Sequence, residues 1–191
     1  MSRDLMHAGE IKEIVRDAYG AIDSSTEAIA AKLYSPEELA LVPRPALERA
    51  LGVGNHLRVA RIEPGETILD LGCGGGIDSI LAAIRTGPSG RVVALDFLPE
   101  MLERTARAAA EAGLENIEVL EAEMEAIPLP DASVDHVISN GVVNLAPRKR
   151  RVLAECARVL VPGGKLSMSD LTVGDEELPT EILSHPATWA G

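Results

Sequence analysis

The chain has 191 residues and a formal net charge of −12, with a sequence pI near 4.8. This length allows one hydrophobic core with an appendage, and the negative charge argues against a nucleic-acid surface, which needs a positive face. Cys73 and Cys156 form no disulfide or zinc-site pattern, and no apolar run is long enough for a leader or a membrane span. We therefore expect a cytoplasmic protein without a metal site, acting on a small molecule rather than on nucleic acid or a membrane.

The first part of the chain, residues 1–62, predicts short helices and no strands. Ser35 and Glu38 make a capping box around Pro36, so a helix is expected to begin there. The expected helices and the loop that follows them cover 9–19, 36–42, 45–51 and 52–56. We expect this part to form a helical cap over a ligand site.

Residues 63–172 change to strands alternating with helices, which predicts a Rossmann-like, doubly wound parallel sheet with helices on both faces. The expected strands cover 67–71, 91–96, 117–120, 134–139 and 165–171, and the expected helices cover 77–85, 99–112 and 147–160. Residues 173–191 form an expected tail of the same single domain. They are too few to supply the strands that normally follow the fifth in such sheets, so we expect C-terminal strands to be missing and the sheet edge to be bare.

The first strand ends in a glycine turn with the spacing Asp70-x-Gly72-x-Gly74-x-Gly76. Glycine allows a sharp turn and a close approach of the backbone to a ligand. A dinucleotide fingerprint requires glycine or alanine where this chain has Ile77, which disfavours an NAD-dependent enzyme. The pattern resembles motif I of class I S-adenosylmethionine (SAM) methyltransferases, and this resemblance implies SAM as the cofactor.

Several further motifs resemble the arsenite methyltransferase family within that class. They cover 52–55, 57–76, 76–78, 122–128, 134–145 and 158–164. The run Ser-Asn-x-Val-x-Asn-Leu over 139–145 is the most distinctive. The arsenic-binding cysteines of the family typically stand where this chain has Val53 and Gly141, and neither residue offers a soft sulfur ligand. The resemblance thus implies the fold and the cofactor, whereas arsenic held by protein thiols is not expected.

The resemblance also implies the residues that would hold SAM. Asp70 and the glycine turn, including Cys73, would hold its methionine end, and Asp96 would accept from both ribose hydroxyls. Phe97 and Met101 would form the adenine wall, although Met101 is equally compatible with a place in the core.

Glu123 would accept from the adenine amino group and the backbone N–H of Met124 would contact the ring. Glu121 and Glu125 are close enough in sequence to leave this register open. Tyr19 would close the cap over SAM, or would simply pack in its helix.

These motifs identify no catalytic residue. Asn140 is expected to line the cofactor and acceptor pocket, because ligands of open α/β sheets bind outside the carboxyl ends of the strands. His56 is a second, weak candidate: as a loop residue it could face the acceptor, but a loop histidine without a functional role is the favoured interpretation. His136 inside a strand is more typical of packing.

These observations predict a SAM-dependent methyltransferase for a small-molecule acceptor. The alternative is a SAM-binding protein without catalysis, which needs a partner or a further C-terminal segment. The acceptor and the oligomeric state are not predicted.

Overall fold

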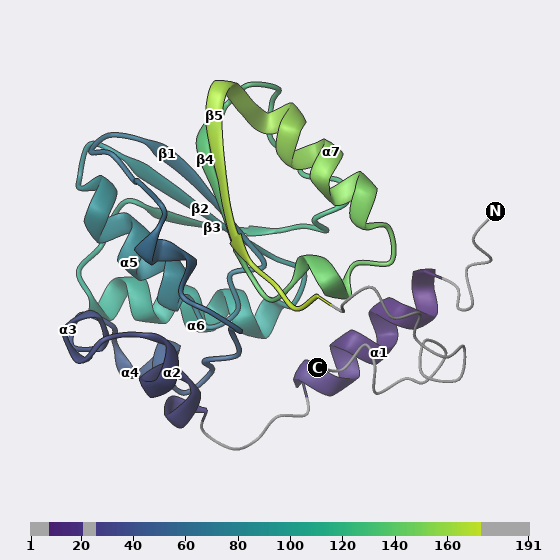
Figure 1. Ribbon diagram of the computed structural model, residues 1–191. Coiled ribbons are helices and arrows are strands. Elements are labelled where there is room, and N and C mark those ends of the chain that lie inside the picture. Colours follow the sequence, from purple (N-terminus) through teal and green to yellow (C-terminus); the bar gives the residue numbers. More distant parts are fainter. Residues whose placement is uncertain (1–7, 21–25, 173–191) are drawn as a thin grey trace.

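The computed structural model describes residues 8–20 and 26–172, and its centre is a five-stranded parallel sheet with the strand order β3-β2-β1-β4-β5 (Figure 1). The strands are β1 Thr67–Leu71, β2 Arg91–Asp96, β3 Ile117–Glu121, β4 Val134–Asn140 and β5 Leu160–Ser169. The α-helices are α1 Ala8–Gly20, α2 Glu27–Leu33, α3 Pro36–Leu39, α4 Arg44–Leu47, α5 Ile77–Thr86, α6 Pro99–Glu111 and α7 Lys149–Val159. Two 3-10 turns are η1 His56–Arg58 and η2 Val143–Leu145. The predicted doubly wound fold is confirmed.

Side chains that alternate along the strands separate two cores, one on each face of the sheet. In β1, Ile68 packs with α5, α6 and the cap, while Leu69 and Leu71 pack with α7. Figure 1 shows α5 and α6 on one face and α7 on the other. Because the cap contributes Tyr34 and Leu57 to the first of these cores, cap and sheet share buried apolar surface.

Element bounds agree with the sequence where capping and strand signals are strong. β1 and β2 have their predicted bounds, and Ser35 and Glu38 form the reciprocal capping box. The short helix α2 was not predicted. α7 begins at Lys149, two residues later than expected, and β5 begins at Leu160 instead of Lys165.

The early start of β5 has a structural cause, because the strand contains an irregularity over its Pro-Gly-Gly segment. Val134 pairs with Leu160 and His136 already pairs with Lys165, so extra residues of β5 lie between these two pairs. Gly163, at φ +84°, supplies the left-handed conformation that this segment requires. A glycine-rich segment that interrupts a strand therefore resembled a helix-to-strand loop in the sequence.

At the far edge of the sheet, β5 pairs with β4 on one side, and within residues 26–172 no strand pairs with its other side. Leu166 and Met168 of β5 are 42% and 44% exposed. The expected tail, 173–191, lies outside the described residues. Among the residues that the structure describes, no helix is both long and apolar enough to cross a membrane.

Candidate functional site

A pocket opens at the carboxyl edge of the sheet, where the order of the strands reverses between β1 and β4. It is lined by the segments that follow β1, β2, β3 and β4, together with residues of α1 and of the rest of the cap. Open α/β sheets bind their ligands at this point because neighbouring crossovers lead to opposite faces and leave a crevice. The pocket is therefore the candidate functional site.

The glycine turn after β1 forms the floor of the pocket. Gly72 and Gly76 have φ angles of +72° and +94°, which side-chain-bearing residues rarely adopt. A Cβ atom at Gly72 would lie 2.7 Å from the side chain of Val142, and one at Gly76 would lie 2.7 Å from Thr105 Oγ1. The turn is thus limited to glycine both by its backbone conformation and by its neighbours.

Asp96 stands at the end of β2 and binds the glycine turn directly. Its Oδ2 accepts from the backbone N–H of Gly74 at 2.9 Å, and its Oδ1 accepts from Leu98 at 3.0 Å. Burial raises the pKa of the Asp96 carboxyl, and these hydrogen bonds act against that shift. Phe97 and Met101 follow it and also line the pocket.

Asp70 lies deeper, at 2% exposure, and its Oδ2 accepts from Ser79 Oγ at 2.5 Å. Burial, and after it the nearby Asp78, raise the pKa of Asp70 to about 8. Cys73 lines the same floor, and burial raises the pKa of its thiol. A floor with buried carboxylates disfavours a further negative charge and favours a cationic ligand.

Asn140 lines the pocket, but its amide is largely engaged by the protein itself. Its Oδ1 accepts from the N–H groups of Val53 and Gly54, at 2.9 and 3.2 Å. Its Nδ2 contacts Gly54 O at 2.8 Å, Asp78 Oδ2 at 2.9 Å and Tyr34 Oη at 3.1 Å. Asn140 therefore joins the cap to the sheet.

Two partners in this junction, Tyr34 and Asp78, were missed in the sequence. The hydroxyl of Tyr34 donates to Asp78 Oδ1 at 2.8 Å, and both residues line the pocket. Asp78 belongs to a motif that carries the family resemblance, and Tyr34 is one of two tyrosines in the chain. These features were the available signals, but neither shows that the two side chains meet.

The three glutamates at and just after the end of β3 have different surroundings. Glu125 is 3% exposed and accepts from Arg148 Nη2 at 3.1 Å, whereas Glu121 is exposed and is not among the residues that line the pocket. Glu123 lines the pocket, and its Oε2 accepts from Lys12 Nζ of α1 at 2.6 Å. Glu125 also lines the pocket, but both of its carboxylate oxygens accept from Arg148, so the geometry favours Glu123, with Met124 beside it, as the acceptor that this segment can offer to a ligand.

Helix α1 lies against the same end of the pocket. Lys12 and Val15 line it, and the guanidinium of Arg16 lies 6.0 Å from the ring centre of Phe97. Tyr19 belongs to α1, but its side chain lies outside the described part of the structure.

The two candidate histidines lie elsewhere. His56 is 3% exposed, neither of its ring nitrogens has a hydrogen-bond partner, and it is not among the pocket-lining residues. The structure thus does not place this weak candidate at the pocket, because η1 packs the His56 side chain inward. His136 is fully buried, with Nε2 2.9 Å from Ser167 Oγ, as suits a packing residue.

Val53 and Gly141, the positions at which the family resemblance led us to look for cysteines, are neighbours in space. A Cβ atom at Gly141 would lie 3.1 Å from Cγ1 of Val53. Cys73 and Cys156 are both buried as free thiols, and they belong to separate cores on opposite faces of the sheet. Among the described residues, no three His, Cys, Asp or Glu side chains are grouped so that they could hold a metal ion.

Comparisons with known proteins agree with this geometry. A family model described as a methyltransferase domain matches residues 62–190. An arsenite methyltransferase from Halobacterium salinarum is 40% identical over 174 residues, which are 90% of this chain and 44% of that protein. A demethylmenaquinone methyltransferase from Listeria monocytogenes is 36% identical over 60% of this chain and 48% of its own length. The chain thus spans less than half the length of these relatives.

Solved structures give the same result for the fold. An arsenic(III) S-adenosylmethionine methyltransferase from Chlamydomonas reinhardtii superposes with a TM-score of 0.72 and 38% identity, over 80% of this chain and 53% of that one. A SAM-dependent methyltransferase from Aquifex aeolicus gives a TM-score of 0.59 and 25% identity, over 92% of this chain and 80% of its own. The chain therefore belongs to the methyltransferase domain family and has the Rossmann-like fold of SAM-dependent methyltransferases.

Proposed function

We propose that this chain binds SAM in the pocket at the carboxyl edge of the sheet and transfers its methyl group to a small molecule. The observation that carries the proposal is the Asp96 carboxylate, which two backbone N–H groups hold beside the glycine turn. A carboxylate oxygen can accept more than one hydrogen bond, so Asp96 retains acceptor sites for two adjacent hydroxyls. This geometry suits the ribose of SAM.

The remaining pocket residues fit the other parts of SAM. Asp70 and the glycine turn suit the cationic methionine end, because burial holds carboxylates there that a positive charge stabilises. Phe97 and Met101 supply apolar surface for the adenine ring, and Glu123 supplies an acceptor for its amino group. Tyr19 belongs to the same proposed set from α1.

When bound, SAM supplies a methyl group that its sulfonium already activates. The task of the protein is then to align an acceptor with this methyl group and to exclude water. Near Asn140 the pocket wall is formed by Gly52, Gly141, Val142 and Leu145, which carry no titratable side chain, and by Tyr34 and Asp78. The side chains of Tyr34 and Asp78 are already engaged with each other and with Asn140. We therefore propose an acceptor that is already nucleophilic and needs no general base, and His56 has no part in the transfer.

The relatives named for arsenic suggest one acceptor, and the structure argues against its usual mode of binding here. Val53 fills the space over Gly141, so the two positions offer apolar surface where sulfur ligands would be needed. We expect purified protein supplied with arsenite, glutathione and SAM to form little methylated arsenic. Efficient formation of methylarsenic species, measured by coupled chromatography and mass spectrometry, would contradict this expectation.

Binding of S-adenosylhomocysteine (SAH), the demethylated product of SAM, tests the proposed function most directly. Isothermal titration calorimetry of the wild-type protein should give a micromolar Kd, and Asp96→Ala should abolish detectable binding because both ribose hydrogen bonds disappear. Glu118→Ala is a matched control, since Glu118 is an exposed carboxylate on β3, outside the pocket. Failure of the wild-type protein to bind SAH would refute the proposal.

A second candidate function is SAM binding without catalysis, with a partner or a further segment completing the site. Among the described residues β5 pairs only with β4, and its Leu166 and Met168 are exposed, which favours this reading. It predicts SAH binding without consumption of SAM when a panel of thiol, amine and phenol acceptors is supplied. Methyl transfer to any of them would exclude it.

We further propose a cytoplasmic location, and a small molecule rather than nucleic acid as the partner. The acidic net charge of −12 supports the second of these proposals. Residues 1–62 would act as the cap and 63–172 as the SAM-binding core of one domain. The core that Tyr34 and Leu57 share with the sheet supports this division.

A further inference from the structure

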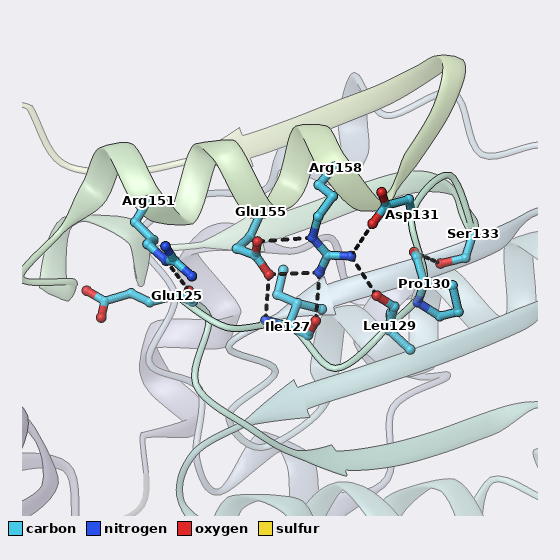
Figure 2. Close-up of polar contacts among 9 residues, drawn as sticks. All are labelled: Glu125, Ile127, Leu129, Pro130, Asp131, Ser133, Arg151, Glu155 and Arg158. Atoms are coloured by element: carbon cyan, nitrogen blue, oxygen red, sulfur yellow. Dashed lines mark hydrogen bonds and ion pairs between the residues drawn. The ribbon is translucent and has the colours of Figure 1, made fainter.

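The segment 122–131, which carries Glu123 and Met124, lies outside the regular strands and helices. Its shape is nevertheless determined by side chains of α7. Figure 2 shows Arg158 at the centre of this contact, with its guanidinium between α7 and the segment. The segment therefore depends on a helix whose own residues Arg158, Glu155 and Arg151 lie outside the pocket lining.

Every N–H group of the Arg158 side chain can be assigned to an acceptor. Its Nη2 donates to Ile127 O at 2.7 Å and its Nη1 to Leu129 O at 2.8 Å, so two backbone carbonyls are bound by one planar group. Nη1 also donates to Asp131 Oδ1 at 2.8 Å. Nε and Nη2 donate to the two carboxylate oxygens of Glu155, at 3.0 and 2.8 Å.

Glu155 completes the contact because it also binds the segment. Its Oε2 accepts from the backbone N–H of Ile127 at 2.9 Å. The hydrogen bonds from Arg158 lower the pKa of Glu155, which keeps this carboxylate charged. Ile127 is thereby bound at its N–H by Glu155 and at its carbonyl by Arg158.

A second contact between α7 and this segment involves Glu125, which itself lines the pocket. The buried Glu125 carboxylate accepts from the backbone N–H of Arg148 at 2.9 Å and from Arg148 Nη2 at 3.1 Å, and Arg151 Nε donates to Glu125 O at 2.9 Å. Figure 2 shows Arg151 and Glu125 beside the Arg158 cluster. The segment is thus attached to α7 at residues 125, 127, 129 and 131.

Glu123 lies between this attached part and the sheet. On its N-terminal side, Ala122 donates to the carbonyl of Asp96 at 3.0 Å, which ties the segment to β2. On its C-terminal side, Ala126 donates to the carbonyl of Glu123 at 3.0 Å and closes a tight turn. A shift of residues 125–127 would therefore move the backbone of Glu123, whose carboxylate also accepts from Lys12 Nζ of α1 at 2.6 Å.

We propose that Arg158 is a positioning residue that sets the selectivity of the pocket for the 6-amino group of adenine, through the placement of Glu123. This inference rests on the proposed function, because it assumes that Glu123 accepts from the adenine amino group. Lysine cannot replace arginine here, since one ammonium group cannot contact two carbonyls and a carboxylate in the same plane. Arg158→Lys should therefore loosen the segment while keeping the charge.

The experiment compares SAH with S-inosylhomocysteine, in which an oxo group replaces the 6-amino group. A hydrogen bond to a charged acceptor corresponds to about tenfold or more in affinity, so the wild-type protein should prefer SAH by at least that factor. Arg158→Lys should reduce this preference several-fold. Arg150→Lys is the matched control, because Arg150 is exposed on the same helix, and it should leave the preference unchanged.

A double-mutant cycle with Glu123→Ala separates positioning from general destabilisation. If Arg158 acts through Glu123, Arg158→Lys should not change the preference in the Glu123→Ala background. Glu155→Gln provides a second, milder perturbation of the same contact and should lower the preference in the same direction. Titrations are made below the melting temperature of each variant, which circular dichroism determines.

Two outcomes overturn the proposal. A preference for SAH that survives Arg158→Lys, or an equal loss of affinity for both ligands, would show that Arg158 stabilises the fold without setting selectivity. A wild-type protein that binds neither ligand would refute the proposed function as well, so the two failures are distinguishable.

Discussion

Replacing Asn140 by aspartate changes one atom of the side chain and tests the junction between cap and sheet. The new carboxyl would keep its bonds from the N–H groups of Val53 and Gly54, since Oδ1 accepts both. Its second oxygen would face Gly54 O at 2.8 Å and Asp78 Oδ2 at 2.9 Å, where the Asn140 amide is placed to donate. The substitution therefore replaces two attractive contacts by repulsive ones.

The size of the effect is limited by protonation of the new carboxyl. Two like charges 3 Å apart repel by about 5 kcal/mol at an effective dielectric constant near 20. Protonating an aspartate at pH 7 costs only about 4 kcal/mol, because its ordinary pKa is about 3 units lower. We therefore expect Asn140→Asp to lower the free energy of unfolding by about 3–4 kcal/mol at pH 7.

The loss should depend on pH in a defined direction. The pKa of the new carboxyl is raised in the folded state, so the variant binds more protons folded than unfolded, and its penalty grows as pH rises above about 4. At pH 5 the protonated group can donate to Asp78, and the loss relative to wild type should fall to about 1–2 kcal/mol.

Urea denaturation followed by circular dichroism at pH 5 and pH 7 measures both values. Asn144→Asp serves as the control, because Asn144 is exposed in the segment just after β4 and gains the same charge. An equal loss at both pH values, or a loss under 1 kcal/mol at pH 7, would refute the junction as described.

Three further predictions follow from the same pocket. Burial raises the pKa of Asp70 to about 8, so SAM should bind more tightly as pH rises from 6.5 to 8.5, and its binding should release protons. Calorimetry in buffers of different ionisation enthalpy detects this release, and pH-independent binding would contradict the assignment. Tyr34→Phe removes the hydroxyl 2.8 Å from Asp78 Oδ1 and should lower the free energy of unfolding by about 1–3 kcal/mol in urea denaturation, and a neutral effect would show that the contact is not stabilising. Gly72→Ala places a Cβ 2.7 Å from Val142 at φ +72°, so it should lower the free energy of unfolding by about 2–4 kcal/mol and weaken SAH binding. Gly113→Ala is the control: its Cβ would meet open space, so only its positive φ should lower the free energy of unfolding, by about 1–2 kcal/mol.

The sequence by itself determined the elements that depend on local signals. The apolar strand Thr67–Leu71, the glycine turn after it and the acidic residue at the end of β2 are all local patterns, so the parallel sheet and its ligand edge were predictable. The capping box at Ser35 was predictable for the same reason. By contrast, the Pro-Gly-Gly segment inside β5 was predicted to be a loop. Its local sequence is typical of a loop, and only the pairing of the flanking residues with β4 makes it part of a strand.

Only the tertiary structure decided how side chains distant in sequence divide their roles. Glu123 and Glu125 are equivalent in the sequence, and burial against Arg148 separates them. Asn140 was expected at the pocket. Its partners Val53 and Gly54 lie 86 or more residues away in sequence, so the sequence did not show that both the oxygen and the nitrogen of its side-chain amide bind other parts of the protein. His56 looked available in a loop and is buried. In each case hydrogen-bond partners and burial depend on packing between segments, which composition and spacing do not contain.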